Sequence, residues 1–229
     1  MKKKLIIFGN AEMGEIAKYY FENFSEYEVK YFTINKEFIT TDNFCSTPII
    51  PFEDIEKNLS TNEYFFHVAL SYQKLNLLRE EKYFEVKKKG YELVNFISEK
   101  SNFDQKKVVF GDNCFILENQ SIQNGVKIGN NVTIWSGNHI GHNSLIDDHT
   151  YLSSHVVISG HCNIGKRCFF GVNSSVADFC KIEDDCFIGM GSQVNKNLKK
   201  LNSAINRSTD YYGKDDRIIN LIKKKYFKF

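Results

Sequence analysis

The sequence lacks any apolar run long enough to cross a bilayer, and it contains only two prolines among its 229 residues. A membrane-spanning helix needs about 20 consecutive apolar residues, so we expect no stable membrane insertion. The first nine residues, basic and then apolar, begin like a secretion signal. Their apolar stretch is short, however, and Asn10, Glu12 and Glu15 follow it without a small-residue cleavage site. The sequence therefore predicts a cytoplasmic protein.

An excess of one charge sign is also missing, because 30 basic and 28 acidic residues leave a net charge of +2. Nucleic-acid-binding domains usually carry a larger and clustered basic excess. Basic residues cluster here only at Lys2–Lys4 and Lys223–Lys225, a pattern typical of solvated chain ends. We therefore expect no nucleic-acid partner.

The six cysteines form no Cys-x-x-Cys pair, so the usual sequence mark of a structural zinc or redox site is absent. Five of them share one position of the repeat described next: Cys114, Cys162, Cys168, Cys180 and Cys186. Free cysteine packs as a small hydrophobic side chain. Core packing is therefore expected of these five.

A strict six-residue repeat occupies residues 110–194. A large aliphatic or aromatic side chain recurs through fifteen consecutive hexads: Phe110, Ile116, Ile122, Ile128, Ile134, Ile140, Ile146, Leu152, Ile158, Ile164, Phe170, Val176, Ile182, Ile188 and Val194. Neither an α-helix nor a pleated hairpin has a period of six. Fixed short periods of this kind indicate a solenoid.

Each hexad is expected to form one short strand and one corner, so that three hexads make a triangular coil. Residues 18 apart then stack as neighbouring parallel strands, about 4.8 Å apart. The large side chain fills the interior of the prism. We assign residues 105–196 to this all-β domain, whose open ends need caps.

Residues 1–104 predict a small parallel α/β domain. Apolar strands are expected at residues 5–8, 29–34, 65–70 and 91–97, and helical segments after the turn Gly9–Gly14, at 52–59 and at 75–89. His67 lies on an apolar strand and is expected in the core. Residues 197–229 lack the hexad, and the spacing of apolar residues from Asp215 to Phe229 predicts an amphipathic helix that caps the solenoid.

A Rossmann-like half-domain followed by unbroken hexads resembles the hexapeptide-repeat sugar acyltransferases. The resemblance covers residues 1 to about 196 and is strongest over the repeat. It points to the sialic-acid O-acetyltransferase type and to the bacillosamine-pathway nucleotide-amino-sugar N-acetyltransferases. It implies a left-handed parallel β-helix, a homotrimer, acetyl-CoA as cosubstrate and a nucleotide-linked amino sugar as acceptor.

The catalytic signature of this family is Ile-x-His-(Glu/Asn), and the matching stretch is Ile140-Gly141-His142-Asn143. The resemblance assigns His142 as the catalytic base and Asn143 as its partner, an amide where the family often has a carboxylate. Histidine suits the role because it titrates near neutral pH. Eighteen residues later lies Gly160, which is expected above the imidazole, with room for a pantetheine arm and with a free backbone N–H for the oxyanion.

Further site residues follow from the same resemblance. Gly160 and the stretch Gly189-Met190-Gly191 are assigned to CoA. The turn Gly9-Asn10-Ala11 before the first helix is assigned to the nucleotide, because a helix N-terminus can hold phosphate. His139 and His155 are expected to line a cleft between subunits and to contact the substrate. Trp135 is expected to pack at an interface or to stack on a sugar or base.

No metal is required, because a thioester is already activated. Zinc is the competing interpretation, since γ-class carbonic anhydrases use histidines on the same type of β-helix. Here His149, His155 and His161 are each six residues apart and fall on three successive corners, so one subunit cannot bring them together.

The sequence thus predicts an acetyl-CoA-dependent N-acetyltransferase that modifies the amino group of a nucleotide-linked deoxyamino sugar for surface glycan biosynthesis. Because an amine attacks with a weaker base than a hydroxyl needs, Asn143 favours N-transfer. Two alternatives remain open: a sugar O-acetyltransferase of the sialic-acid type and a non-catalytic β-helix scaffold.

Overall fold

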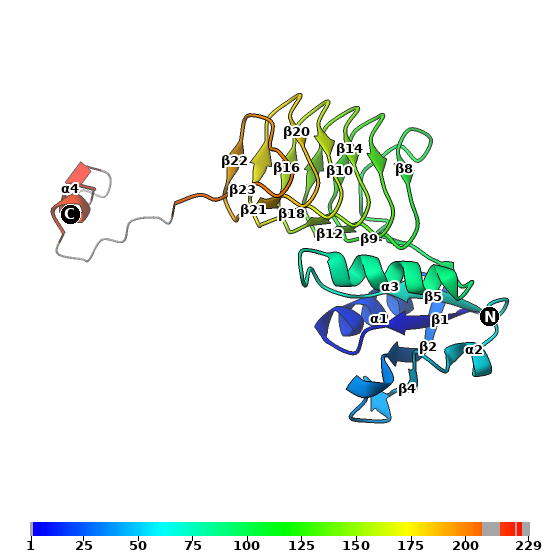
Figure 1. The fold of residues 1–229 in the computed structure, drawn as a ribbon. Coiled ribbons are helices and arrows are strands. Elements are labelled where there is room, and N and C mark those ends of the chain that lie inside the picture. Colours follow the sequence, from blue (N-terminus) through cyan, green and yellow to red (C-terminus); the bar gives the residue numbers. More distant parts are fainter. Residues whose placement is uncertain (1, 208–215, 223, 226–229) are drawn as a thin grey trace.

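The computed structural model describes residues 2–207, 216–222 and 224–225. An α/β domain at the N-terminus lies beside one face of a long β-helix, and a short C-terminal helix follows (Figure 1). The predicted combination of a small parallel α/β domain and a hexapeptide β-helix is confirmed.

The N-terminal sheet has six strands in the order β3-β4-β2-β1-β5-β6. Its strands are β1 (Lys3–Phe8), β2 (Tyr27–Ile34), β3 (Asn43–Phe44), β4 (Thr47–Pro51), β5 (Tyr64–Val68) and β6 (Glu92–Leu93). All pairs are parallel except β3 with β4. The helices are α1 (Glu12–Phe24), η1 (Lys36–Phe38), α2 (Ile55–Asn58) and α3 (Leu77–Lys88). His67 lies in the core of this domain, 1% exposed, with Nδ1 2.9 Å from the Val94 carbonyl oxygen.

The single strand predicted at residues 91–97 is wrong, because the chain divides it between two sheets. β6 pairs with β5, whereas β7 (Phe96–Ile97) pairs with the β-helix strand β9. Asn95 lies between them. Its side-chain amide donates to the Gly111 carbonyl at 2.7 Å and accepts the Cys114 N–H at 2.7 Å. These bonds stabilise the crossing, and the β-helix sheets therefore begin at Phe96.

Fifteen two-residue strands, one for each predicted hexad, form the β-helix with one further strand at each end. The first face contains β10 (Ser121–Ile122), β13 (His139–Ile140), β16 (Val157–Ile158), β19 (Ser175–Val176) and β22 (Gln193–Val194). The second face contains β8 (Val109–Phe110), β11 (Lys127–Ile128), β14 (Leu145–Ile146), β17 (Asn163–Ile164) and β20 (Lys181–Ile182). The third contains β7, β9 (Phe115–Ile116), β12 (Thr133–Ile134), β15 (Tyr151–Leu152), β18 (Phe169–Phe170), β21 (Phe187–Ile188) and β23 (Ser203–Ala204).

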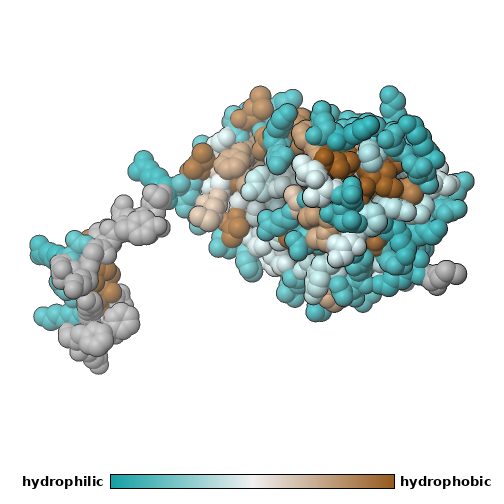
Figure 2. Space-filling view, turned by 90° about the horizontal axis from the view of Figure 1, so that it is seen from below, coloured by the Kyte–Doolittle hydropathy of each residue, from teal (hydrophilic) through white to brown (hydrophobic). Residues whose placement is uncertain are grey.

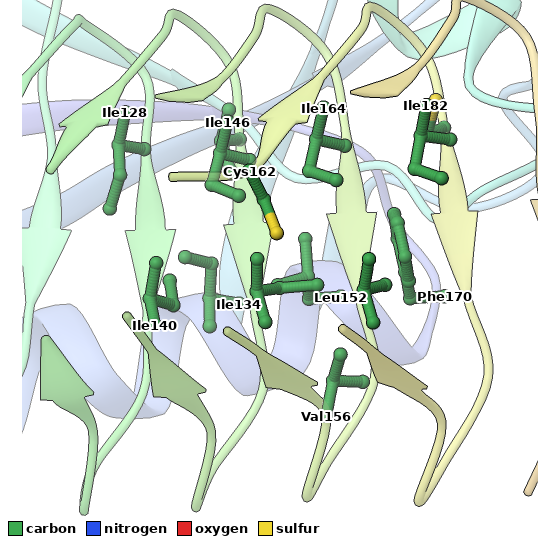
Figure 3. Close-up of a cluster of buried hydrophobic side chains, with 14 of the residues drawn as sticks. Ile128, Ile134, Ile140, Ile146, Leu152, Val156, Cys162, Ile164, Phe170 and Ile182 are labelled. Atoms are coloured by element: carbon green, nitrogen blue, oxygen red, sulfur yellow. The ribbon is translucent and has the colours of Figure 1, made fainter. Parts of the chain in front are cut away.

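The interior of the prism is built from columns of side chains spaced 18 residues apart. One such column is Ile128, Ile146, Ile164 and Ile182, which Figure 3 shows in a row. All four are buried, as are the five cysteines of the repeat. The predicted coil and the packing role of those cysteines are confirmed.

The corners rely on a left-handed backbone at the fourth position of the hexad. We call the corner after each face by the number of that face. Fourth-position residues with positive φ are Asn113, Asn119, Asn131, Asn143, His149, His155, His161, Arg167, Asn173, Phe179 and Asp185, together with Gly125, Gly137 and Gly191. Asn, Asp, His and Gly tolerate this region best. Three of the clustered histidines therefore stand where the backbone favours their residue type.

The helix α3 fastens the N-terminal domain to the second corner. Arg79 is 1% exposed. Its guanidinium donates to the carbonyls of Asn131 and His149, the latter at 2.7 Å. Asn76 donates to the carbonyl of Arg167 at 3.2 Å. The three carbonyls belong to successive fourth-position residues, so α3 satisfies a whole column of corner acceptors. Burial lowers the pKa of Arg79 to about 10, which leaves the guanidinium charged at neutral pH.

A buried polar column runs beside this anchor. The Asn113 side chain donates to the Asn131 side-chain oxygen at 2.7 Å, and the Asn131 amide nitrogen lies 2.9 Å from Nδ1 of His149. Because that Asn131 nitrogen is a donor, Nδ1 of His149 accepts and Nε2 carries the proton. Nε2 lies 3.4 Å from a Glu80 carboxylate oxygen. Burial, with the positive charge of Arg79, lowers the pKa of His149 to about 4.

At the C-terminal end, residues 197–206 complete the last coil. β23 pairs with β21, and Leu198 is buried against the core beside Ile182. The helix α4 (Arg217–Ile222) has no buried residue and lies apart from the prism in Figure 1. That the tail caps the β-helix stays a prediction. Of the helix predicted from Asp215 to Phe229, residues 215, 223 and 226–229 lie outside the described residues.

The surface on the side of the N-terminal domain is mainly hydrophilic, with small separate hydrophobic groups (Figure 2). In the described part of the chain, no helix has the length and apolar character needed to span a bilayer.

Replacing Arg79 with Met is expected to lower the free energy of unfolding by about 3 kcal/mol, because several buried carbonyls lose their donor. Urea unfolding followed by the fluorescence of Trp135, the single tryptophan, measures the change. Lys87→Met is the matched control on the same helix. Lys87 forms an ion pair with Asp112 at 2.7 Å and is about half exposed, so its loss should cost less than about 1 kcal/mol. Equal stability of Arg79→Met and wild type would contradict the anchor.

The neutral, buried His149 predicts acid sensitivity. Its folded-state pKa of about 4 lies below the ordinary value of 6.5, so the unfolded chain binds more protons between these values. Stability therefore falls as the pH drops from about 6.5 towards 4. His149→Asn keeps a residue type that tolerates the backbone and should remove a loss on the order of 2 kcal/mol. Unfolding curves at pH 7 and pH 4.5 test this, with His139→Asn as the control that leaves the pH dependence unchanged.

Candidate active site

His142 occupies the first corner of the β-helix and is exposed to solvent. Gly160, one coil further on, lies against its ring. A Cβ atom built on Gly160 would stand 2.7 Å from Cε1 of His142, closer than real Cβ contacts allow. The stacking predicted from the 18-residue spacing is therefore present, and the imidazole fills the space that a side chain at position 160 would need.

The His142 ring is held by Gln123 of the preceding coil. The Gln123 side-chain oxygen Oε1 accepts the backbone N–H of His142 at 2.8 Å and lies 2.9 Å from Nδ1 of the same residue. Sequence reasoning missed Gln123, because it stands 19 residues before His142 rather than 18. The signal that could have found it is a long polar side chain diagonally below the histidine in the coil arithmetic.

The free backbone N–H predicted at Gly160 is wrong. This N–H donates to Oδ1 of Asp178 at 2.8 Å. Asp178 follows Gly160 by 18 residues, so the same column that places the glycine above His142 also supplies an acceptor for its N–H. Another donor has to meet an oxyanion at this corner.

The structure does not support Asn143 as the partner of the imidazole. Asn143 has a left-handed backbone, with φ of 55°. Its side-chain oxygen lies over Gly125 of the preceding coil, 2.2 Å from a Cβ built there. Among the described residues, the side-chain hydrogen bond to the His142 ring comes from Gln123. At a corner, consecutive residues point along different columns, so the neighbour in sequence is not the neighbour in space.

Two aromatic rings extend the first corner beyond His142. The ring centroids of His142 and His161 are 4.9 Å apart and nearly perpendicular, and His161 stacks on Phe179 at 4.9 Å. Phe179 is 73% exposed. His161 was assigned only to a corner by the sequence. The structure places it beside His142, again 19 residues away.

The other predicted site residues lie elsewhere on the same chain. His139 is half-buried on the first face. His155 is exposed at the third corner, over Gly137. Met190, 73% exposed, and its glycine neighbours 189 and 191 are also at the third corner. The candidate residues thus occupy both edges of the first face, and one subunit does not bring them together.

A cavity of about 690 Å³ opens between the N-terminal domain and the third face. Gly9, Asn10 and Ala11, at the start of α1, line it as predicted for a nucleotide site. Trp135 and Tyr151 line it from the β-helix, with the indole N–H donating to the tyrosine hydroxyl. Aromatic side chains and a helix N-terminus therefore meet in one hollow.

The two glycines of this turn have a packing reason that does not depend on a ligand. Gly9 has φ of 121°, and a Cβ there would lie 2.6 Å from the Ala69 carbonyl oxygen. A Cβ at Gly14 would lie 2.1 Å from the carbonyl oxygen of Gly9. Both positions require glycine for the close approach of backbone segments.

Charge in the cavity is nearly balanced. Lys82 lines it and forms hydrogen bonds to both carboxylate oxygens of Glu85, at 3.0 and 2.9 Å. Glu12 lines the opposite side, in the first turn of α1. A bound phosphate would meet the positive end of the α1 dipole. No group of three or more His, Cys, Asp or Glu side chains that could hold a metal ion occurs in residues 2–207 or the described part of the tail.

The repeat matches two family profiles. Residues 125–160 and 161–196 match the bacterial transferase hexapeptide (six repeats), and residues 107–140 match the hexapeptide repeat of succinyl-transferase. Residues 107–196 are thus a hexapeptide-repeat region of the bacterial transferase class. The family indicated by the hexads is confirmed over this region. A comparison with curated protein sequences gives no significant match.

Solved structures share the whole architecture. The acetyltransferase domain of PglB from Neisseria gonorrhoeae FA1090, in complex with acetyl coenzyme A, has a TM-score of 0.79 and 17% identity, covering 89% of this chain and 96% of that chain. A mutant of perosamine N-acetyltransferase from Caulobacter crescentus, in complex with CoA and GDP-perosamine, has a TM-score of 0.75 and 19% identity, covering 87% and 90%. WeeI from Acinetobacter baumannii AYE has a TM-score of 0.59 and 14% identity, covering 88% and 96%. At these identities the likeness shows the fold, a left-handed parallel β-helix behind a small α/β domain.

Gly160→Ala is expected to displace the His142 ring without disturbing the backbone, because the built Cβ meets only imidazole atoms. Acetyl transfer should fall at least about 10-fold, whereas the free energy of unfolding should change by less than about 1 kcal/mol. Gly141→Ala is the contrast. Its Cβ would lie 2.5 Å from the Gly160 backbone nitrogen, so it should destabilise strongly. In a His142→Ala background, Gly160→Ala should cost no stability; a loss there would contradict the contact.

Proposed function

We propose that this protein is an acetyl-CoA-dependent N-acetyltransferase that acts on the amino group of a nucleotide-linked deoxyamino sugar. The observation that carries the proposal is the exposed imidazole of His142, held beneath Gly160 at a corner of a hexapeptide β-helix. The two solved structures of highest TM-score described above support it, since one contains acetyl coenzyme A and the other CoA with GDP-perosamine. Formation of a surface glycan is the biosynthetic role proposed with it.

The chemistry needs one base and one oxyanion donor. The acceptor amine attacks the thioester carbonyl carbon of acetyl-CoA, and Nε2 of His142 takes the proton that the nitrogen loses. The tetrahedral intermediate then expels the thiolate of CoA, and the imidazolium returns the proton to that sulfur. The products are the N-acetyl sugar and CoA. General-base catalysis of this kind contributes roughly 10²- to 10⁴-fold.

A homotrimer completes the proposed site. The outward positions of the first face carry no charge: Ser121, His139, Val157, Ser175 and Gln193. Interface centres are depleted in charged residues, so this face suits contact between copies. If three copies place their first faces around a threefold axis, the first corner of each meets the third corner of the next. His142 of one copy then approaches His155, Met190 and the aromatic edge of the cavity of another.

The cavity at the start of α1 is the proposed site for the nucleotide. Trp135 and Tyr151 offer aromatic surface to a base or sugar, and the α1 N-terminus offers backbone N–H groups to phosphate. This arrangement would hold the nucleotide on the N-terminal domain while the amino sugar extends towards the neighbouring subunit. Gly189, Met190 and Gly191 remain the proposed contacts to CoA.

The decisive experiment is a mass-spectrometric assay with acetyl-CoA and a panel of UDP-, dTDP- and GDP-linked 3-amino and 4-amino sugars, with free sialic acid included. We expect one amino sugar to gain a single acetyl group, and His142→Ala to lose at least about 100-fold in rate. Arg217→Ala, in the exposed helix α4, is the control expected to keep the wild-type rate.

Each other outcome identifies what is wrong. Acetylation of sialic acid alone would keep the donor and the fold but change the acceptor to a hydroxyl. Full activity of His142→Ala would overturn the base. If acetyl-CoA does not bind in calorimetry, the enzyme proposal fails and a scaffold role replaces it.

A further inference from the structure

The orientation of the Gln123 side chain is fixed by the backbone it contacts. Its amide group lies within hydrogen-bond distance of the His142 backbone N–H, at 2.8 Å. That N–H is always a donor. If the Gln123 amide were turned over, its NH₂ group would face another donor at that distance. The atom nearest His142 is therefore the side-chain oxygen.

This oxygen in turn fixes the tautomer of the imidazole. Nδ1 of His142 lies 2.9 Å from the same Gln123 oxygen. A carbonyl oxygen has two lone pairs and no proton, so it can accept from both the backbone N–H and Nδ1 but can donate to neither. Nδ1 must then carry the proton of the neutral ring. Nε2 consequently keeps its lone pair, and no printed hydrogen bond among the described residues involves it.

We propose that Gln123 is the positioning residue of the active site: it holds His142 in the tautomer in which Nε2 is the base. This rests on the proposed function, in which His142 takes the proton of the acceptor. Gly160 limits the ring from the opposite side, since its missing side chain leaves just the space that the imidazole occupies. The two contacts restrain both the tilt and the tautomer of the ring.

The choice of an amide over a carboxylate has its own consequence. A carboxylate beside Nδ1 would stabilise the protonated imidazole by its charge, and a base that is protonated at working pH cannot act. The Gln123 oxygen makes the same hydrogen bonds without a charge. His142 thereby stays available as a base at lower pH than it would beside a glutamate.

The test uses two substitutions at one position. Gln123→Glu keeps both acceptor contacts and adds a charge, so it should move the acidic limb of the pH–rate profile up by about one pH unit. Gln123→Leu removes the acceptor, so kcat should fall by about 10- to 100-fold with an unchanged KM for acetyl-CoA. Gln105→Leu, the same change at an exposed glutamine 18 residues earlier, should leave both parameters at the wild-type value. Thermal unfolding establishes that each variant is folded.

A second readout needs no sugar acceptor. Diethyl pyrocarbonate modifies the unprotonated imidazole, and peptide mass spectrometry reports the modification of His142 alone. The pH of half-maximal modification should rise by about one unit in Gln123→Glu and stay unchanged in Gln105→Leu.

The two proposals can fail separately. If His142→Ala remains active, the base assignment is wrong. If His142→Ala is inactive but both Gln123 variants keep the wild-type rate, pH profile and modification profile, only the positioning role of Gln123 is overturned.

Discussion

The register of the 18-residue coil is the constraint on which the rest of the structure depends. Parallel pairing places each residue directly beneath the one 18 positions later, so every outward side chain belongs to a column. A single inserted residue would move each later side chain out of its column. This explains why the hexads continue from Phe110 to Val194 without a slip. It also means that the contacts of His142 with Gly160 and Gln123 are set by the backbone rather than by a flexible loop.

The same register determines how the N-terminal domain attaches. Fourth-position residues at the second corner turn their carbonyls away from the strand pairing, and those of Asn131, His149 and Arg167 would otherwise lack a protein donor. Arg79 and Asn76 from α3 supply it. A buried charge is tolerated only when its hydrogen bonds are made, and a column of carbonyls is an arrangement that one guanidinium can satisfy. The cavity beside α1 is thereby held at a fixed place on the third face.

The sequence predicts interior columns and fails at diagonal contacts. The period of six identified the coil, the buried cysteines and the position of Gly160, because each follows from a spacing of 18. It did not identify Gln123 or His161, which reach His142 across neighbouring columns at a spacing of 19. The Asp178 contact does follow the 18-residue spacing, but a strand pattern does not say which backbone N–H a side chain takes. Arg79 stands in a helix rich in charged residues, so its burial depends on the tertiary contact alone.

The hexad position also separates the histidines by cause. His149, His155 and His161 occupy fourth positions with positive φ, where histidine is one of the few side chains that the backbone tolerates. Their presence therefore needs no ligand to explain it. His142 occupies the third position, which in other hexads is Glu118, Lys166 or Met190 and which imposes no left-handed backbone. Nothing in the geometry of the corner calls for an imidazole there, yet Gly160 is shaped to its ring and Gln123 is bonded to it. A side chain that the fold does not need, but that the fold holds in one orientation, is the one whose chemistry the protein uses.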